Sequence, residues 1–218
     1  MTLTNAEVMR ALRDVVGAAY VLEDEEARAR YGVDRTTLAP PAPCCVVRPD
    51  TTAQVQAIVR LAREHGVALV PSGGRTGLSG GAVAARGEVV VALERMNRLV
   101  EFNAEERAIT VEAGMITARL QEHAAARGLL YAVDFASAGS SHIGGNIATN
   151  AGGIKVIRYG MTRVQVLGLK VVDGRGEVLD LNRGLVKNNT GAAPRQPFAR
   201  SDATRGTITE ATPAPPNA

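Results

Sequence analysis

Two glycine-rich segments hold the residues best suited to chemistry. Residues 71–81 read PSGGRTGLSGG and follow the apolar run 67–70, and residues 139–153 read GSSHIGGNIATNAGG. Glycine lets a chain turn through positive φ, so that backbone N–H groups approach a phosphate closely, while Ser and Thr hydroxyls supply further donors. The first segment therefore suggests a nucleotide or dinucleotide cofactor. Two such segments in one chain indicate one extended ligand.

The familiar phosphate loops fit these segments badly. A Walker loop requires Lys and then Ser or Thr after its last glycine, whereas Gly81 is followed by Ala82 and Val83. A Rossmann fingerprint requires the spacing G-x-G-x-x-G at the start of a helix, which is absent here, and residues 88–93 predict a strand. Two bland interpretations stay open, a glycine-rich surface turn for the first segment and a small-residue packing seam for the second.

Composition narrows the class of protein. The 218 residues are 45% hydrophobic with a net charge of +3, and no basic block is interleaved with aromatic residues, so we expect no nucleic-acid partner. Cys44 and Cys45 are adjacent and are the only cysteines, which excludes a disulfide framework and predicts one buried and one partly covered thiol. Neither a secretory signal nor a bilayer-spanning apolar run occurs, so we expect a cytoplasmic protein without an integral membrane segment.

Periodicity and turn signals predict the elements around the two segments. Helices are expected at 5–18, after a capping box formed by Thr4 and Glu7, at 51–65 and at 117–127. Strands are expected at 45–49, 67–70, 88–93, 99–103 and 107–113, with a hairpin joining 166–172 to 177–181. The first glycine-rich segment then ends a β-α-β unit. Residues 192–218, rich in Pro, Ala, Arg and Thr, are expected to be disordered.

Several motifs together resemble a known flavin-binding family. Residues 71–81, 139–153, 159–160, 167–176 and 187–191 are similar to the FAD-binding domain of the vanillyl-alcohol-oxidase (PCMH-type) superfamily, above all to its D-2-hydroxyacid dehydrogenases. That group includes glycolate oxidase, D-lactate dehydrogenase and D-2-hydroxyglutarate dehydrogenase. The resemblance implies an α+β fold of two subdomains, a small β-α-β unit and a larger mixed sheet with flanking helices. We expect a helical segment at 1–34, the FAD-binding domain at 35–191 and the tail at 192–218.

The resemblance also implies which residues bind FAD. In that family the first loop wraps the pyrophosphate, and the second lies along the pyrophosphate and the flavin ring. The residues expected at the phosphates are Gly73, Gly74, Arg75, Thr76, Gly77, Gly80 and Gly81. Those expected along the ribityl chain and ring are Ser141, Gly144, Gly145, Asn146, Thr149, Asn150 and Gly153. Asp134 and Ile208 are also expected to bind the cofactor. Where some relatives attach the flavin through a histidine, this chain has Arg75, so we expect non-covalent FAD.

The family reaction moves a hydride from Cα of a 2-hydroxy acid to flavin N5 while a base takes the hydroxyl proton. His65 and His123 are expected to be solvated on helices, and His142 to donate from the second loop to a phosphate or carbonyl. In relatives the substrate-binding arginine, the metal-ligand histidines and the base come from a following substrate domain, which these residues do not contain. We therefore assign no catalytic residue and predict no metal ligand.

Beyond residue 191 the chain departs from the family. Relatives continue with Tyr-Asp-Leu and a Gly-Ser-Glu-Gly-Thr-Leu-Gly loop, whereas residues 200–206 read RSDATRG, with Ala203 in place of a glycine. A truncated, non-catalytic flavin-binding module is therefore the alternative to a 2-hydroxyacid oxidoreductase. Another branch of the superfamily, such as an aldonolactone oxidase or an enolpyruvyl-sugar reductase, is a more distant one. The expected partner is a small 2-hydroxy acid; its identity, the electron acceptor and assembly into a homo-oligomer are left open.

Overall fold

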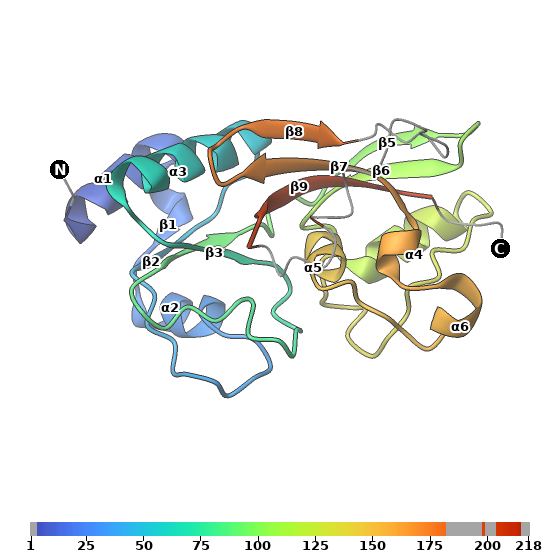
Figure 1. Ribbon diagram of the computed structural model, residues 1–218, viewed down its shortest axis with the longest axis horizontal. Helices are drawn as coiled ribbons and strands as arrows, with labels where there is room; N and C mark the ends of the chain where they lie inside the picture. Colours follow the sequence, from blue (N-terminus) through green and yellow to red (C-terminus); the bar gives the residue numbers. More distant parts are fainter. Residues whose placement is uncertain (1–3, 182–197, 199–203, 215–218) are drawn as a thin grey trace.

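The computed structural model describes residues 4–181, 198 and 204–214, which form two sheets side by side with helices around them (Figure 1). One sheet has the strand order β1-β2-β4-β3 and the other β5-β6-β9-β7-β8. The strands are β1 (Val21–Leu22), β2 (Cys45–Val47), β3 (Leu69–Ser72), β4 (Val89–Ala92), β5 (Leu99–Asn103), β6 (Ala108–Glu112), β7 (Val166–Asp173), β8 (Val178–Leu181) and β9 (Gly206–Pro213). The helices are α1 (Asn5–Val16), α2 (Glu25–Tyr31), α3 (Thr52–His65), α4 (Thr117–Ala125), α5 (Ile143–Ala148) and α6 (Val156–Tyr159), with 3-10 turns η1 (Ala18–Tyr20) and η2 (Thr162–Val164).

The smaller sheet contains the predicted β-α-β unit. Strands β2 and β3 both run parallel to β4, and α3 is the crossover between them. The Thr51 hydroxyl accepts a hydrogen bond from the N–H of Gln54 at the start of α3, and Gly66, at φ 69°, ends the helix. The sequence predicted this helix within one residue, because its cap, its apolar spacing and its terminal glycine agree.

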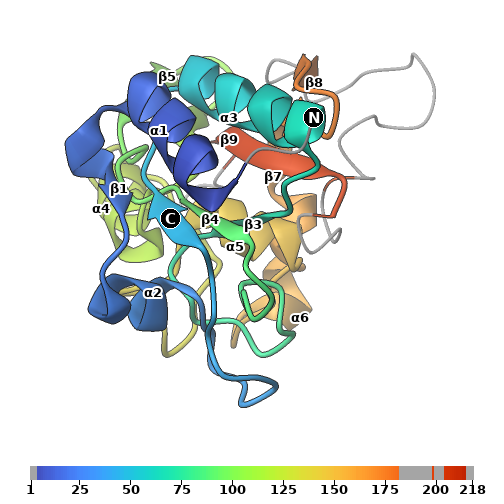
Figure 2. The same ribbon diagram turned by 90° about the vertical axis from the view of Figure 1, so that its left-hand side faces the viewer.

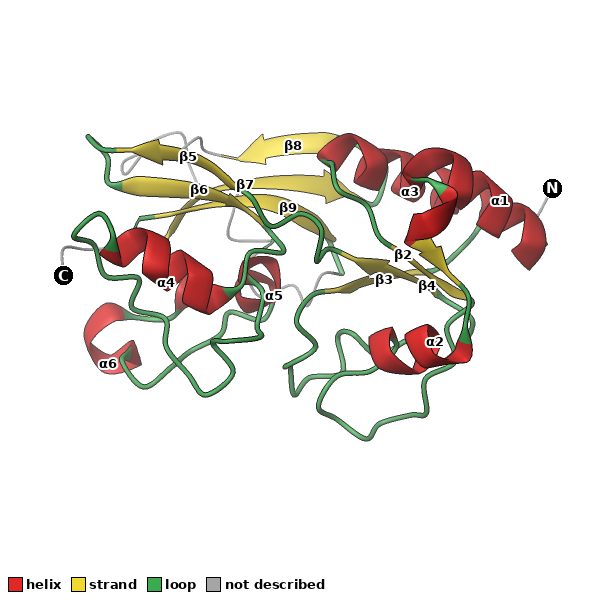
Figure 3. Ribbon diagram, turned by 180° about the vertical axis from the view of Figure 1, so that it is seen from behind, coloured by secondary structure: helices red, strands yellow, loops and turns green. Residues whose placement is uncertain are grey.

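Helices cover both faces of the smaller sheet, α1 and α3 on one side and α2 on the other (Figures 2 and 3). Alternate residues of β2 and β4 therefore belong to different clusters, with Val46 and Val90 packed against Tyr31 of α2, and Val47 and Val91 in the cluster of α3. Burial on both faces explains why these strands are continuous runs of valine. Cys45 of β2 is buried and Cys44 is half-buried, as predicted.

The N-terminal segment packs onto this same sheet. The predicted capping box of α1 is present, since the Thr4 hydroxyl accepts from the N–H of Glu7 and the Glu7 side chain accepts from the N–H of Thr4. Residues Val21 and Leu22 then pair antiparallel with β2. No helix within the described part of the chain is long and apolar enough to cross a membrane.

The expectation of a disordered tail is wrong for residues 206–213, which form β9 in the middle of the larger sheet. This strand pairs antiparallel with β6 on one side and β7 on the other, and Thr207, Ile208, Thr209 and Ala211 are buried. Apart from Ile208, the residues of β9 are small or polar, but backbone hydrogen bonding on both sides makes the segment a strand. The motif at 187–191, the boundary near residue 191 and Ala203 lie outside the described residues.

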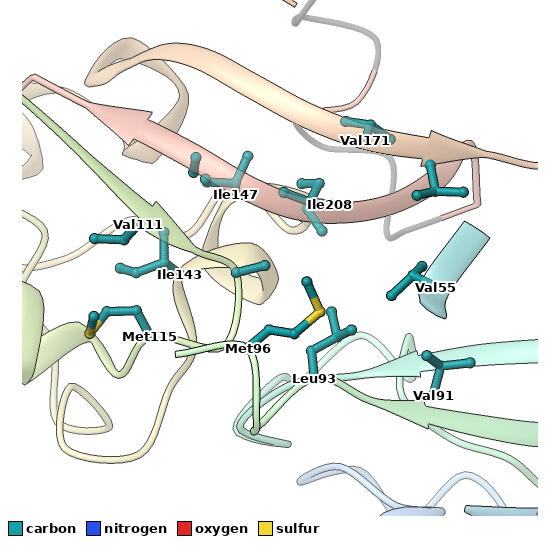
Figure 4. Close-up of a cluster of buried hydrophobic side chains, with 14 of the residues drawn as sticks. Val55, Val91, Leu93, Met96, Val111, Met115, Ile143, Ile147, Val171 and Ile208 are labelled. Carbon is teal, nitrogen blue, oxygen red and sulfur yellow. The ribbon is translucent and has the colours of Figure 1, made fainter. Parts of the chain in front are cut away.

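One apolar core connects the two sheets. In Figure 4, Ile143 and Ile147 of α5 lie near Ile208 of β9, and Leu93 and Met96 continue the core toward the smaller sheet. The predicted hairpin is also present, since β7 and β8 pair antiparallel around a turn in which the Asp173 carboxylate accepts from the N–H groups of residues 175 and 177. The second glycine-rich segment is not all loop, because its middle forms α5.

Candidate functional site

The two glycine-rich segments lie against each other where the two sheets meet. A Cβ added to Gly74 would lie 2.1 Å from the backbone oxygen of Ser140, and one added to Gly73 would lie 3.3 Å from Cβ of His142. Only glycine allows the backbones to approach this closely. The two segments therefore lie together as predicted. They also line a cleft, which neither a surface turn nor a packing seam requires.

The cleft contains about 820 Å³ of empty space, part of which is open solvent. Both segments contribute to its wall, together with residues from the strand ends of both sheets. The predicted cofactor residues that line it are Gly73, Gly74, Arg75, Thr76, Gly77, Gly81, Gly144, Gly145, Asn146, Thr149 and Ile208. Lining residues outside that predicted set are Asp34, Pro71, Ser72, Ser79, Ala82, Leu93, Ala113, His142, Ala148 and Thr207.

The first segment presents unused backbone donors to the cleft. None of the N–H groups of residues 73–79 donates a hydrogen bond to another described residue. Backbone N–H groups left free in this way, next to hydroxyls and in a glycine-rich turn, form the concavity that binds anions in proteins. The arrangement therefore fits a phosphate-containing ligand.

Arg75 adds a positive charge to the same wall. Its Nη1 donates to the Gly73 carbonyl at 2.9 Å, and its guanidinium lies 4.6 Å from the centroid of the Tyr31 ring. No acidic side chain of the described residues lies within ion-pair distance of Arg75. Burial lowers the pKa of Arg75, but a guanidinium stays charged in proteins. A partly buried, unpaired cation attracts an anionic ligand.

Several predicted residues use their side chains inside the protein. Asn146 Nδ2 donates to the Thr117 hydroxyl at 2.7 Å, and that hydroxyl lies 2.7 Å from the hydroxyl of Ser141. Asn146 lines the cleft, whereas Ser141 lies behind it and is buried. This network joins α4 to the second segment, so these residues position α5.

The remaining predicted residues lie off the lining for identifiable reasons. Asn150, at φ 51°, accepts a hydrogen bond from the N–H of Arg163. A Cβ on Gly153 would lie 2.3 Å from the backbone oxygen of Asp134, whose carboxylate pairs with Lys155 at 3.2 Å. These residues fix the chain between α5 and α6.

Asp34 is one of the residues at the cleft that the sequence did not reveal. Its carboxylate accepts from the N–H of Gly80 at 2.8 Å and from the N–H of Thr36 at 2.7 Å, and Gly80 itself lies just off the lining. The contact joins residues 46 positions apart. Nothing local to Asp34 indicates it, because it lies in an irregular connector.

Of the three histidines, only His142 lines the cleft. It lies in the second segment directly before α5 and is buried, and its Nδ1 has no hydrogen-bond partner in the described part of the chain. Burial, and then the nearby charge of Arg75, lower the pKa of His142 to about 4. The expected donation to a phosphate or carbonyl therefore concerns a neutral ring. His65 and His123 are half-buried on helices away from the cleft.

The burial of His142 predicts acid sensitivity. In the unfolded chain His142 binds a proton near its ordinary pKa of 6.5, whereas in the folded chain its pKa is about 4. The free energy of unfolding therefore falls as the pH falls through this window. We expect wild type to lose up to roughly 3 kcal/mol more of its free energy of unfolding than His142→Asn does between pH 7 and pH 4. Urea unfolding at both pH values measures this, with His123→Asn as control; equal losses in wild type and His142→Asn would contradict it.

A comparison with known families decides the identity of the fold. Residues 43–182 match the family described as FAD binding domain. The chain belongs to this family. The α+β fold with two sheets agrees with the resemblance predicted above, and the cofactor of the family is FAD.

Three relatives of this FAD-binding domain are named D-2-hydroxyglutarate dehydrogenase. The chain is 54% identical over 210 residues to D-2-hydroxyglutarate dehydrogenase of Stutzerimonas stutzeri and 50% identical over 212 residues to that of Xanthomonas citri pv. viticola. These matches cover 96% and 95% of the chain, but 45% of each relative. The mitochondrial D-2-hydroxyglutarate dehydrogenase of Bos taurus is 35% identical over 95% of the chain and 38% of its own length. The chain thus spans less than half the length of these relatives.

Solved structures share the fold. An alkyldihydroxyacetonephosphate synthase superposes with a TM-score of 0.87 at 22% identity, covering 99% of this chain and 41% of its own. A substrate-bound p-cresol methylhydroxylase gives a TM-score of 0.80 at 21% identity, covering 97% and 43%. At these identities the similarity establishes the fold alone.

The cleft of the FAD-binding domain fits the cofactor. A Cβ on Gly145 would meet nothing within 4 Å, so this glycine leaves open space at the cleft wall. Free N–H groups, an unpaired arginine and the buried polar atoms of Ser72 and His142 supply partners for a long, polar, doubly charged molecule.

Proposed function

We propose that this chain is the cofactor-binding part of an FAD-dependent dehydrogenase that oxidises a D-2-hydroxy acid. The cleft between the two glycine-rich segments, with its free N–H groups, carries the proposal. D-2-hydroxyglutarate is the first substrate to test, because the relatives at 54% and 50% identity are named for it; D-lactate and glycolate are the alternatives. Bound FAD supplies the hydride acceptor. The residues of this chain bind and orient it.

We also propose that the FAD is held without a covalent bond. Residues 71–81 contain no histidine, and Arg75 occupies the position at which some relatives attach the flavin. Its side chain is directed to Tyr31 and the Gly73 carbonyl. Acid precipitation of the loaded protein is expected to leave the flavin in the supernatant; flavin in the pellet would contradict this.

A second candidate is a flavin-binding module without activity of its own. The ionisable side chains of the described cleft lining are Asp34, Arg75 and His142. The Asp34 carboxylate already accepts hydrogen bonds from Gly80 and Thr36, the Arg75 guanidinium stays charged, and burial lowers the pKa of His142 to about 4, which makes its imidazole a weak base. A strong base for the hydroxyl proton is thus absent from this described lining, which favours a binding role for the isolated chain.

Two measurements separate the candidates. FAD titration with fluorescence quenching is expected to show uptake, and a purified chain that takes up no FAD would contradict both. Anaerobic addition of D-2-hydroxyglutarate, D-lactate or glycolate to the loaded chain then tests reduction. Bleaching of the flavin band near roughly 450 nm supports the dehydrogenase; uptake without bleaching supports the module. The cytoplasmic location and the assembly into a homo-oligomer stay predictions from the sequence.

Arg75 should contribute to affinity through its charge. Hydrogen bonds to charged groups contribute about 1.5–3 kcal/mol, so we expect Arg75→Gln to weaken FAD binding roughly 10- to 100-fold. Raising the salt concentration should reduce the difference in FAD affinity between Arg75→Gln and wild type, because salt screens the charge of Arg75. Fluorescence titration at low and high salt measures both effects. Arg30→Gln is the matched control, since Arg30 also lies over the Tyr31 ring, at 5.5 Å, but is exposed and away from the cleft.

A further inference from the structure

Two buried polar side chains at the meeting point of the segments have no partner. Ser72, the last residue of β3, is 1% exposed, and His142, directly before α5, is 8% exposed. Neither Ser72 Oγ nor His142 Nδ1 makes a hydrogen bond within the described part of the chain. Buried polar atoms are paired in nearly all proteins, because an unpaired one has lost its water without compensation.

Both residues belong to the same stretch of the cleft wall. Each lines the cleft, and Gly73, which follows Ser72, lies directly against His142. A Cβ on Gly73 would be 3.6 Å from His142 Nδ1, so the imidazole covers the turn that leaves Ser72. Since the two residues come from different segments, only the assembled cleft brings them together.

We propose that Ser72 and His142 form one hydrogen-bonding site for an uncharged polar group of the FAD, separate from the part of the cleft that holds its diphosphate. The proposal rests on the proposed function, since it takes FAD as the ligand. It divides the cleft into a charged end and an uncharged end.

The chemistry of the two residues supports this division. A neutral imidazole has one donor and one acceptor nitrogen, and a hydroxyl both donates and accepts. Together they suit a carbonyl, a hydroxyl or a ring nitrogen, which the ribityl chain and flavin ring provide. The charged groups that act on His142 are Arg75 and Glu94, and Arg75 opposes a positive imidazole. The free N–H groups of residues 73–79 and Arg75 are better suited to the phosphates.

The test compares how variants bind FAD at several salt concentrations. We expect Ser72→Ala and His142→Leu each to weaken FAD binding about 5- to 20-fold. Because salt screens interactions between charges and leaves hydrogen bonds between neutral groups largely unaffected, the slope of log Kd against log salt should stay that of wild type. His142→Asn, which keeps a polar atom near the place of Nδ1, should restore at least half of the lost binding free energy. The double variant should lose less than the product of the two single losses.

Two control variants should leave FAD binding unchanged. Ser140→Ala removes an exposed hydroxyl that does not line the cleft and His123→Leu removes an imidazole away from the cleft; both should bind FAD within twofold of wild type. Affinities of Ser72→Ala and His142→Leu within twofold of wild type overturn the inference, as does a changed salt slope in either. Wild type that binds no FAD overturns the proposed function and this inference together. Wild type that binds, with unaffected variants, overturns the inference alone.

Discussion

Gly74→Val is expected to abolish FAD binding while both sheets remain folded. The new Cβ would lie 2.1 Å from the backbone oxygen of Ser140 and 2.8 Å from Cα of Ser141, distances that no Cβ tolerates. Because both atoms belong to the backbone, no rotamer change relieves the clash, and the two segments must move apart. We expect FAD affinity to fall by more than about a thousandfold, roughly 4 kcal/mol.

Fluorescence titration measures this affinity, and circular dichroism shows whether the chain is folded. Gly139→Val is the matched control, because a Cβ on Gly139 meets nothing within 4 Å, although the residue lies in the second segment next to Ser140. It should bind FAD within a few-fold of wild type. Wild-type affinity in Gly74→Val would show that contact between the segments does not shape the FAD site.

Ala211→Asp is expected to unfold the chain. Ala211 is 1% exposed and stands opposite Val111 of β6 and Leu169 of β7, in the middle strand of the larger sheet. A carboxylate there would lose its water without gaining a partner, which costs at least about 4 kcal/mol, and this is a large part of the stability of a domain. Thermal unfolding should show no cooperative transition at 25 °C or above.

Val178→Asp provides the comparison for this prediction. Val178 begins the edge strand β8 of the same sheet and is 41% exposed, so its carboxylate stays in water and the melting temperature should change by only a few degrees. If Ala211→Asp melted like Val178→Asp, β9 would not be the central strand described here.

The sequence predicted those parts of the fold whose signals are local. Helix α3 has a capping hydroxyl at Thr51, regular apolar spacing and Gly66 in the left-handed conformation, so three independent signals agree. The β7–β8 hairpin follows in the same way from its Asp-Gly-containing turn. The position of β9 had no such signal. A short segment of Thr, Ile, Glu and Ala becomes a strand only because β6 and β7 offer free edges on both sides of it.

In the site, too, the sequence predicted the features that are local, and tertiary packing decided the others. Glycine at 73, 74 and 77 and the hydroxyls among them mark an anion-binding turn from sequence alone, because that property belongs to the backbone of consecutive residues. Which side chains face the cleft depended on contacts between distant segments. Tertiary packing turned Ser141 inward to Thr117, brought Asp34 to Gly80 and left the polar atoms of Ser72 and His142 buried at the cleft wall. Local chemistry therefore predicted a phosphate-containing cofactor, and the meeting of the two sheets decided which residues line the cleft, since hydrogen bonding and burial are set by neighbours in space.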